Sequence, residues 1–274
     1  MNALDTAEPS GRPWVGPLTE HADFVAASEL YQRVFSYSTA SYALNANLLM
    51  ALVRNGGTAV GARSPRGELI GFAYGFMGVE GDEVYHYSQA AVVDPAWQGH
   101  GLGRRLKLAQ RDVVLDLGIT HMRWAYNPVF ARNGHFNLNS LGGIAIDFLP
   151  DYYGRPDTDR LLIDWALDGA HEIYGDLRRL RPPSSVLEAP VGTAVPAEEV
   201  LDGSWVVLPA HHVAGAHTEE AREAGRALRR GLVDVFAGGG VLVSCVKVGA
   251  DTAVYLRAPR ARSLALVGEG GEAA

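Results

Sequence analysis

Three glycines that alternate within residues 90–118, AAVVDPAWQGHGLGRRLKLAQRDVVLDLG, constrain this chain more than any other feature of its sequence. An apolar run ends at Asp94-Pro95, the glycines follow at 99, 101 and 103, and a helical pattern then runs to Gly118. Glycine permits a positive φ and a close approach of the backbone to a ligand. A glycine loop that leads into a helix presents backbone N–H groups and the positive end of the helix dipole. The pattern therefore predicts either a phosphate or pyrophosphate site or a tight turn without a ligand.

The spacing of the glycines excludes two familiar phosphate-binding loops. A dinucleotide-binding fingerprint requires G-x-G-x-x-G, but the sixth position counted from Gly99 is Arg104. A P-loop requires a Gly-Lys-Ser/Thr end, which this stretch lacks.

Hydrophobic periodicity around the loop predicts a mixed α/β domain. Ahead of the loop, the patterns indicate a helix at 19–36 with Thr19 as N-cap, a helix at 41–57, and strands at 58–64, 68–79 and 84–93. After the loop and its helix come a strand at 121–129, a short helix at 132–143 and a strand at 160–167. This order predicts a mixed sheet with helices on its faces.

A proline-rich connector at 179–199 precedes the C-terminal part of the chain. Beyond it we expect a helix at 218–237 and a hairpin of strands at 241–248 and 252–258. One face of that helix carries Ala221, Ala224, Leu228, Leu232 and Val235. This tail either forms an extra lobe or completes the sheet. We therefore divide the chain into a flexible leader at 1–17, a domain at 18–180 and a C-terminal extension at 181–274.

Charge and composition narrow the class of protein. The 274 residues carry 24 basic and 31 acidic side chains, a net charge of −7, which argues against a broad nucleic-acid surface. The single cysteine, Cys245, excludes an intrachain disulfide and fits a reducing compartment. The start of the sequence lacks the features of a signal peptide, and no apolar run approaches the length of about 18 residues for a membrane span. We expect a cytoplasmic protein without a nucleic-acid or membrane partner.

The glycine stretch resembles a family motif. Val93-Asp-Pro-Ala-Trp-Gln98-Gly99-His-Gly101-Leu-Gly103 is similar to the Val-x-Pro-x-x-(Arg/Gln)-Gly-x-Gly-x-(Gly/Ala) motif of the GNAT acyl-CoA N-acyltransferases. The resemblance covers residues 18 to about 168 and includes the order of helices and strands. The whole chain also resembles bacterial members without an assigned substrate, which share a His-Phe-Asn segment, here 135–137, and a Tyr-Tyr-Gly turn, here 152–154. It implies a GNAT fold followed by a C-terminal helix-plus-hairpin extension.

The resemblance also implies the ligand, acetyl-CoA or another acyl-CoA, without a metal. Its pyrophosphate would be held by Arg104 and by the backbone N–H groups of Gln98, Gly99, His100, Gly101, Leu102 and Gly103. Arg104 and Arg105 either add charge there or are two solvated helix residues. The backbone of Ala91 and Val93 would pair with the pantetheine arm, and Asn127 would lie near that arm.

The catalytic positions depart from the family's usual residues. The resemblance implies that the N–H of Val93 stabilises the oxyanion, while the family's usual base positions hold Tyr87 and Gln89. By strand alternation these share a face with Glu83, the only carboxylate there, which acts as a base through water or is a solvated turn residue. His86 points the other way unless a bulge shifts the register.

The family's acid for the leaving thiolate, a tyrosine four residues before a glycine, would stand at Leu138 here. His135 and Asn139 are the nearest candidates, since helical spacing places them on one face and Asn137 on another. Their alternative role is a structural one, as polar groups that cap a turn.

These residues predict an acyltransferase that moves an acetyl or other short acyl group to the amine of a small molecule or amino acid, with a homodimer among the expected assemblies. Two alternatives stay open. The scaffold could carry a thioester decarboxylase or an acyl-carrier-protein-dependent acyltransferase, or it could bind coenzyme A without catalysis.

Overall fold

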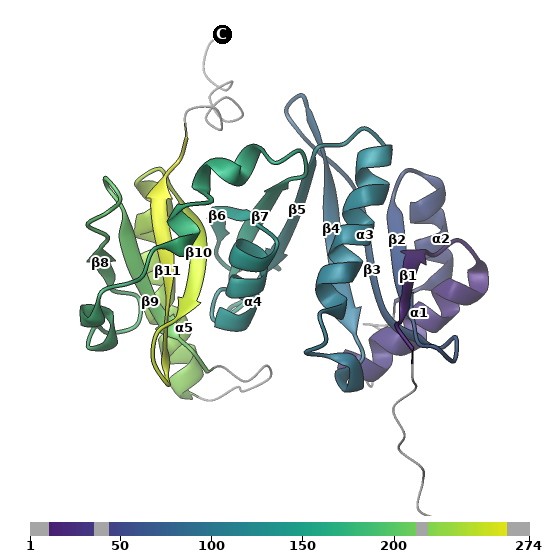
Figure 1. Cartoon of the computed structure of the whole chain (residues 1–274), viewed down its shortest axis with the longest axis horizontal. Helices are drawn as coiled ribbons and strands as arrows, with labels where there is room; N and C mark the ends of the chain where they lie inside the picture. Colours follow the sequence, from purple (N-terminus) through teal and green to yellow (C-terminus); the bar gives the residue numbers. More distant parts are fainter. Residues whose placement is uncertain (1–10, 36–43, 212–218, 262–274) are drawn as a thin grey trace, which may run out of the picture. The chain divides into compact units, whose positions relative to one another are not determined.

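The computed structural model describes residues 11–35, 44–211 and 219–261 (Figure 1). Internal contacts divide the chain into two compact units. The first runs to Val79 and resumes over Val84–Met122, and the second comprises Glu80–Glu83 and the chain from Arg123 onward.

The first unit is an antiparallel sheet between helices. Its strands follow the order β1 (Trp14–Pro17), β2 (Thr58–Arg63), β3 (Leu69–Glu80) and β4 (Glu83–Val93). Its helices are α1 (His21–Phe35), α2 (Ala46–Arg54) and α3 (Leu102–Asp116). Two hydrophobic clusters separate the faces of the sheet: α1 and α2 pack against Phe72, whereas α3 packs against Val60 and Ile70.

Local signals set the ends of these helices. The side chain of Asn45 accepts hydrogen bonds from the N–H groups of Asn47 and Leu48 and so caps α2, which ends before Gly56 with its φ of +85°. Thr19, the predicted cap of α1, instead donates its own N–H to the carboxylate of Asp23.

The second unit is a larger sheet of seven strands in the order β5-β7-β6-β10-β11-β9-β8. Their bounds are β5 His121–Tyr126, β6 Ile144–Leu149, β7 Arg160–Ala166, β8 Ala194–Pro196, β9 Ser204–Pro209, β10 Gly240–Lys247 and β11 Thr252–Pro259. Helix α4 (Ala131–His135) continues as one π-helical turn (Phe136–Ser140). Short 3₁₀ segments at Ala170–Tyr174, Leu177–Arg179 and Ser184–Leu187 precede α5 (Glu219–Ala237).

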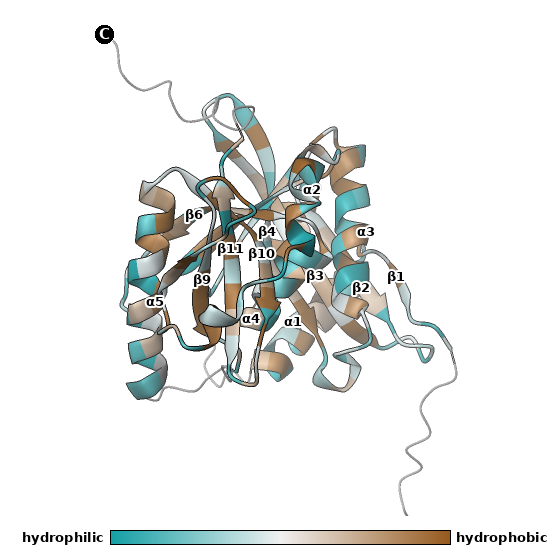
Figure 2. Cartoon of the chain, turned by 60° about the vertical axis from the view of Figure 1, so that its left-hand side comes forward, coloured by the Kyte–Doolittle hydropathy of each residue, from teal (hydrophilic) through white to brown (hydrophobic). Residues whose placement is uncertain are grey.

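The C-terminal segment completes this sheet. Strand β10 pairs with β6 through Leu242 and Ala145, and β11 pairs with both β10 and β9. Buried side chains of α5, Leu228, Leu232 and Val235, face the interior. In Figure 2, β9 is hydrophobic along most of its length, whereas α5 alternates between hydrophobic and hydrophilic turns, as expected of a helix with one buried face. Of the two alternatives for the tail, completion of the sheet is therefore correct.

The predicted α/β class with a mixed sheet is confirmed, but four strands were not predicted. Residues 14–17, assigned to the leader, form β1, an edge strand that tolerates Pro17 because its outer side needs no partner. Strand β6 follows a glycine pair, and β8 and β9 lie in or beside the proline-rich connector, where short patterns are hard to recognise. The division of the chain near residues 80 and 123 also differs from the predicted boundary at 180.

Candidate functional site

A loop of the first unit connects β4 to α3, as the glycine pattern predicted. It begins with a 3₁₀ turn, Pro95–Trp97, which Asp94 caps by accepting a hydrogen bond of 3.0 Å from the N–H of Ala96. The side chain of Gln98 then donates to the carbonyl of Val93 over 3.1 Å. These two contacts fold the loop back onto the end of the strand.

Two of the glycines adopt a conformation that other residues avoid. Gly99 has a φ of +84° and Gly101 a φ of +73°, and Gly101 is the N-cap of α3 without any side chain to cap it. A Cβ atom placed on either glycine would meet no protein atom within 4 Å. The loop therefore presents bare backbone on its outer side.

The start of α3 presents backbone donors beside this bare surface. The first hydrogen bond that we find along the helix runs from the N–H of Arg105 to the carbonyl of Gly101, over 3.2 Å. The N–H groups of Leu102 and Gly103 precede it, at the end of the helix where backbone N–H groups have no acceptor within the helix. Together with the helix dipole, they form a site suited to an anion.

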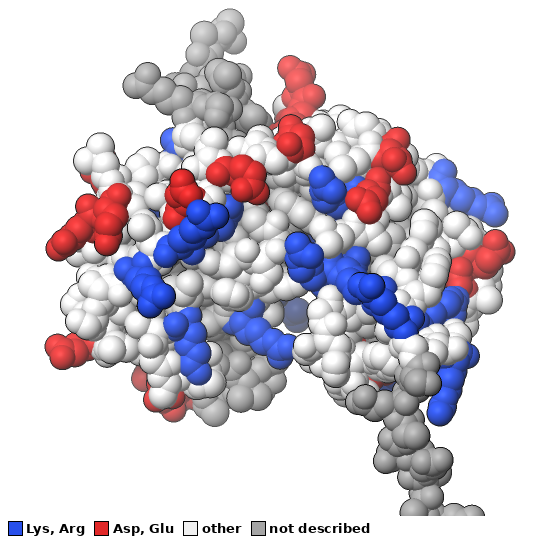
Figure 3. Space-filling model, in the orientation of Figure 1, with Lys and Arg blue, Asp and Glu red and all other residues white. Residues whose placement is uncertain are grey.

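Side chains near the loop differ in their orientation. Leu102 is buried in the core beneath α3, so it contributes only its backbone, whereas His100 and Arg104 are exposed. Arg105 donates to the carbonyl of Pro13 over 2.6 Å and is thereby engaged by the chain itself. Figure 3 shows several Lys and Arg side chains in a row over α3 on the visible face of this unit.

The side-chain alternation of β4 changes phase between Ser88 and Ala90. Ser88 faces α3, where it hydrogen-bonds Gln110, but Ala90 and Val92 pack in the opposite cluster with α1 and α2. Val93 is again on the α3 side. A one-residue bulge explains the shift, because regular alternation would place residues 88, 90 and 92 on one face. The bulge follows His86, so His86 still faces α3, alternation up to Tyr87 places Glu83 and Tyr87 on the opposite face, and Gln89 lies at the phase change.

Backbone groups of β4 point in directions that suit the predicted pantetheine contacts. The N–H of Asp94 donates to the carbonyl of Ile70 on β3 over 2.9 Å. Because successive N–H groups of a strand point to opposite sides, those of Val93 and Ala91 point away from β3. Ala91 is exposed.

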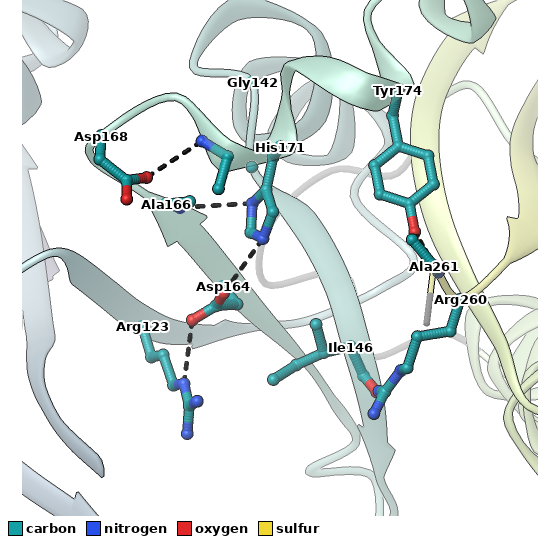
Figure 4. Close-up of polar contacts among 12 residues, drawn as sticks. Arg123, Gly142, Ile146, Asp164, Ala166, Asp168, His171, Tyr174, Arg260 and Ala261 are labelled. Carbon is teal, nitrogen blue, oxygen red and sulfur yellow. Dashed lines mark hydrogen bonds and ion pairs between the residues drawn. The ribbon is translucent and has the colours of Figure 1, made fainter. Parts of the chain in front are cut away.

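In the second unit, Glu83 belongs to a cluster of charges around Arg123, of which Figure 4 shows Arg123 and Asp164. The Arg123 side chain is 6% exposed, and its three nitrogens contact Asp164 at 2.9 Å, Glu80 at 2.5 Å and Glu83 at 2.6 Å. Burial lowers the pKa of Arg123, but the hydrogen bond and charge of Asp164, with those of the glutamates, raise it above its ordinary value. Glu83 is therefore one arm of a buried ion-pair network.

His171 lies on the other side of Asp164 (Figure 4). Its Nδ1 accepts a hydrogen bond of 3.3 Å from the N–H of Ala166, so the neutral ring carries its proton on Nε2. That Nε2 lies 3.3 Å from the Asp164 carboxylate, close but without hydrogen-bond alignment. The sequence offered no signal for this group, because its members are far apart along the chain.

His135 and Asn139 both bind β10. The Nδ1 of His135 lies 3.0 Å from the carbonyl of Cys245, and Asn139 donates to the hydroxyl of Ser244 and accepts from the N–H of Cys245, each over 2.8 Å. Asn137 instead accepts a hydrogen bond from the Trp124 indole over 3.2 Å. The predicted division of faces is thus confirmed, and the face shared by His135 and Asn139 fastens the π-helical turn to the sheet.

We expect Asn139→Ala to lower the free energy of unfolding by about 2–5 kcal/mol, because it leaves two buried partners of its amide unsatisfied. His135→Ala should cost less, about 0.5–1.5 kcal/mol, since it removes one hydrogen bond of an exposed side chain. Urea unfolding measures both. A His135→Ala variant that keeps its stability but loses thiol release would instead support the predicted role as acid.

Asn127 has a local structural contact. Its side-chain oxygen accepts a hydrogen bond of 3.1 Å from the N–H of Val129, which stabilises the turn after β5. Its predicted position near the pantetheine arm stays a prediction.

Residues 11–35, 44–211 and 219–261 show neither a metal-binding cluster nor a membrane-spanning helix. No group of three or more His, Cys, Asp and Glu side chains among them has the arrangement of a metal site. No helix within residues 11–35, 44–211 and 219–261 is both long and apolar enough to cross a membrane.

Comparison with known proteins gives one family match. Residues 24–133, less than half of the chain, match the model of the acetyltransferase (GNAT) family. No curated protein matches the chain.

Among similar solved structures, yncA of Salmonella typhimurium with its cofactor acetyl-CoA is 20% identical, with a TM-score of 0.47 over 64% of this chain and 99% of that one. PaiA N-acetyltransferase of Thermoplasma acidophilum in complex with coenzyme A is 12% identical, with a TM-score of 0.43 over 57% and 99%. The GNAT family N-acetyltransferase YhbS of Escherichia coli in complex with CoA is 17% identical, with a TM-score of 0.41 over 61% and 88%.

Proposed function

We propose, from the premise that residues 24–133 belong to the GNAT acetyltransferase family, that this protein is an acyl-CoA-dependent N-acyltransferase for the amine of a small molecule or amino acid. One observation carries the proposal. The loop between β4 and α3 has the family's glycine spacing, positive φ at Gly99 and Gly101, and an uncapped helix start. Such a loop binds a pyrophosphate through backbone alone.

In this proposal the loop and strand β4 bind different parts of the acyl-CoA. The N–H groups from Gln98 to Gly103, with Arg104, bind the pyrophosphate of an acyl-CoA. The N–H groups of Ala91 and Val93 point away from β3 and receive the pantetheine arm and the thioester. His100 is exposed and contributes its backbone to the same loop.

The reaction is the attack of a neutral amine on the thioester carbon. A C–N bond forms, the carbonyl oxygen becomes an oxyanion that the N–H of Val93 stabilises, and the C–S bond then breaks to release coenzyme A as thiolate. The amine loses one proton, to Glu83 through water in our assignment, and the thiolate gains one, from His135 in our assignment.

Thiol release from several acyl-CoAs, measured with and without a panel of amines, tests the proposal. Release that depends on an amine is the expected result. Carbon dioxide release without amine would favour decarboxylation. Binding without turnover would favour a non-catalytic module, a reading consistent with Glu83, His135 and Asn139 all being engaged in contacts within the chain.

A further inference from the structure

Five buried polar side chains form one connected chain in the interior of the first unit, apart from the loop and from the groups assigned to catalysis. Each is at most 3% exposed: Thr58 at the start of β2, His86 and Ser88 on β4, and Lys107 and Gln110 on α3. A lysine in the core between a helix and a sheet is costly, and this position would pack a leucine at lower cost.

The hydrogen bonds among these five side chains form one series. The Lys107 amine donates to the Ser88 hydroxyl over 2.7 Å, and Ser88 donates to Gln110 over 2.8 Å. Gln110 donates to Thr58 over 3.2 Å, and the Thr58 hydroxyl lies 2.8 Å from Nε2 of His86. Since the Ser88 hydroxyl accepts from Lys107 and donates to Gln110, which in turn donates to Thr58, Lys107 is the first donor of the series.

The surrounding backbone is adapted to this chain of contacts. A Cβ atom on Gly75 would lie 2.3 Å from the His86 ring, so only glycine leaves room for the imidazole at this point of β3. Lys107 follows Gly101 by six residues along α3, and Ser88 directly precedes the phase change of β4. The Lys107–Ser88 contact therefore joins the helix that carries the glycine loop to the strand that carries Ala91 and Val93.

We propose that Lys107 is a positioning residue for the acyl-CoA. Its hydrogen bond to Ser88 fixes α3 against β4, so that the N–H groups of the loop and those of the strand bind the same acyl-CoA molecule. This inference rests on the proposed function. Loss of the contact would leave each set of N–H groups intact and change their relative placement.

Protonation of Lys107 connects this contact to pH. Burial lowers the pKa of Lys107 from 10.5 to about 7, and burial together with the charge of Lys107 lowers the pKa of His86 to about 3. Around the amine, Thr58 of β2 and Met122 of β5 do not titrate, and β1 has no ionisable side chain. The other charged groups of α3 are Arg104, Arg105, Arg111, Asp112 and Asp116.

The sign of the pH effect follows from these pKa values. Between pH 7 and pH 10.5 the unfolded chain binds a proton that the folded chain does not, so stability rises with pH across this window. Below pH 7 both states are protonated, and the folded protein must hold an ammonium group in its core.

The test compares Lys107→Met, which cannot donate to Ser88, with Lys107→Gln, which keeps a donor but does not titrate. Calorimetry measures the affinity for dephospho-CoA, a probe without the ionisable 3′-phosphate of coenzyme A, at pH 6 and pH 8.5. We expect Lys107→Gln to bind with wild-type affinity, and Lys107→Met to bind at least threefold more weakly at both pH values. Wild-type affinity in Lys107→Met would overturn the proposal.

Two further measurements separate this proposal from its premise. Ser88→Ala should weaken binding as Lys107→Met does, whereas Ser244→Ala, an equally buried serine in the second unit, should not. Equal effects of the two serine variants would also overturn the positioning role. In urea unfolding, the wild-type equilibrium constant should change up to tenfold per pH unit above pH 7, and Lys107→Met should lack this slope. A wild type that shows the slope but binds no donor would refute the proposed function, and with it the role assigned to Lys107.

Discussion

Gly101→Val is expected to weaken the binding of coenzyme A more than tenfold, which corresponds to about 1.4 kcal/mol or more. A Cβ atom on residue 101 would meet no protein atom within 4 Å, so the valine side chain would project into the space where the pyrophosphate is expected. It would also hinder the N–H groups at the start of α3, which provide the binding energy in our proposal. Calorimetry with coenzyme A measures the effect directly.

Gly118→Val provides a matched control at the opposite end of the same helix. Gly118 has a φ of +77°, against +73° for Gly101, and a Cβ atom on it also meets no protein atom within 4 Å. Both variants therefore carry a similar backbone strain of about 1–2 kcal/mol, but only one adds a side chain beside the loop. Similar losses of affinity in both variants would show that strain, and not a pyrophosphate site, explains the result.

The loop could be predicted from sequence because its information is local. Consecutive residues determine that Gly101 caps α3 and that Gly118 follows its end, and the structure places the helix at Leu102–Asp116 within that range. The GNAT motif is equally local. Strand β6 was missed because six residues after a glycine pair carry too little periodicity, and its identity depends on pairing with β7 and β10.

The interior groups could not be predicted because they depend on contacts between distant residues. Lys107 follows two arginines in an amphipathic helix and therefore reads as a solvated residue, yet it is 3% exposed. Arg123 likewise gave no signal, although it determines the surroundings of Glu83. Alternation grouped Glu83 with Tyr87 and Gln89, but the phase change between Ser88 and Ala90 falls at Gln89 and appears only when the packing of both faces is known.

Glu83→Gln is expected to lower turnover roughly 100-fold or more if Glu83 accepts the amine proton through water, because the amide cannot act as a base. The affinity for the donor should barely change, since the pyrophosphate loop contains no part of Glu83. The complication is that Glu83 also binds Arg123, so a loss of activity alone would not separate proton transfer from a disturbed ion pair.

Glu80→Gln resolves this ambiguity, because Glu80 contacts the same guanidinium over 2.5 Å, against 2.6 Å for Glu83. Each variant removes one carboxylate charge from Arg123 and keeps a side-chain oxygen that can accept its hydrogen bond. The Arg123 side chain is 6% exposed, and each variant leaves it paired with Asp164 and with the other glutamate, so the buried guanidinium keeps two carboxylate partners in both variants. A catalytic Glu83 therefore predicts that only Glu83→Gln loses turnover, while the two melting temperatures stay similar. If both variants slow thiol release to the same extent, Glu83 supports Arg123 and the base must be sought elsewhere. If neither does, the amine loses its proton directly to water.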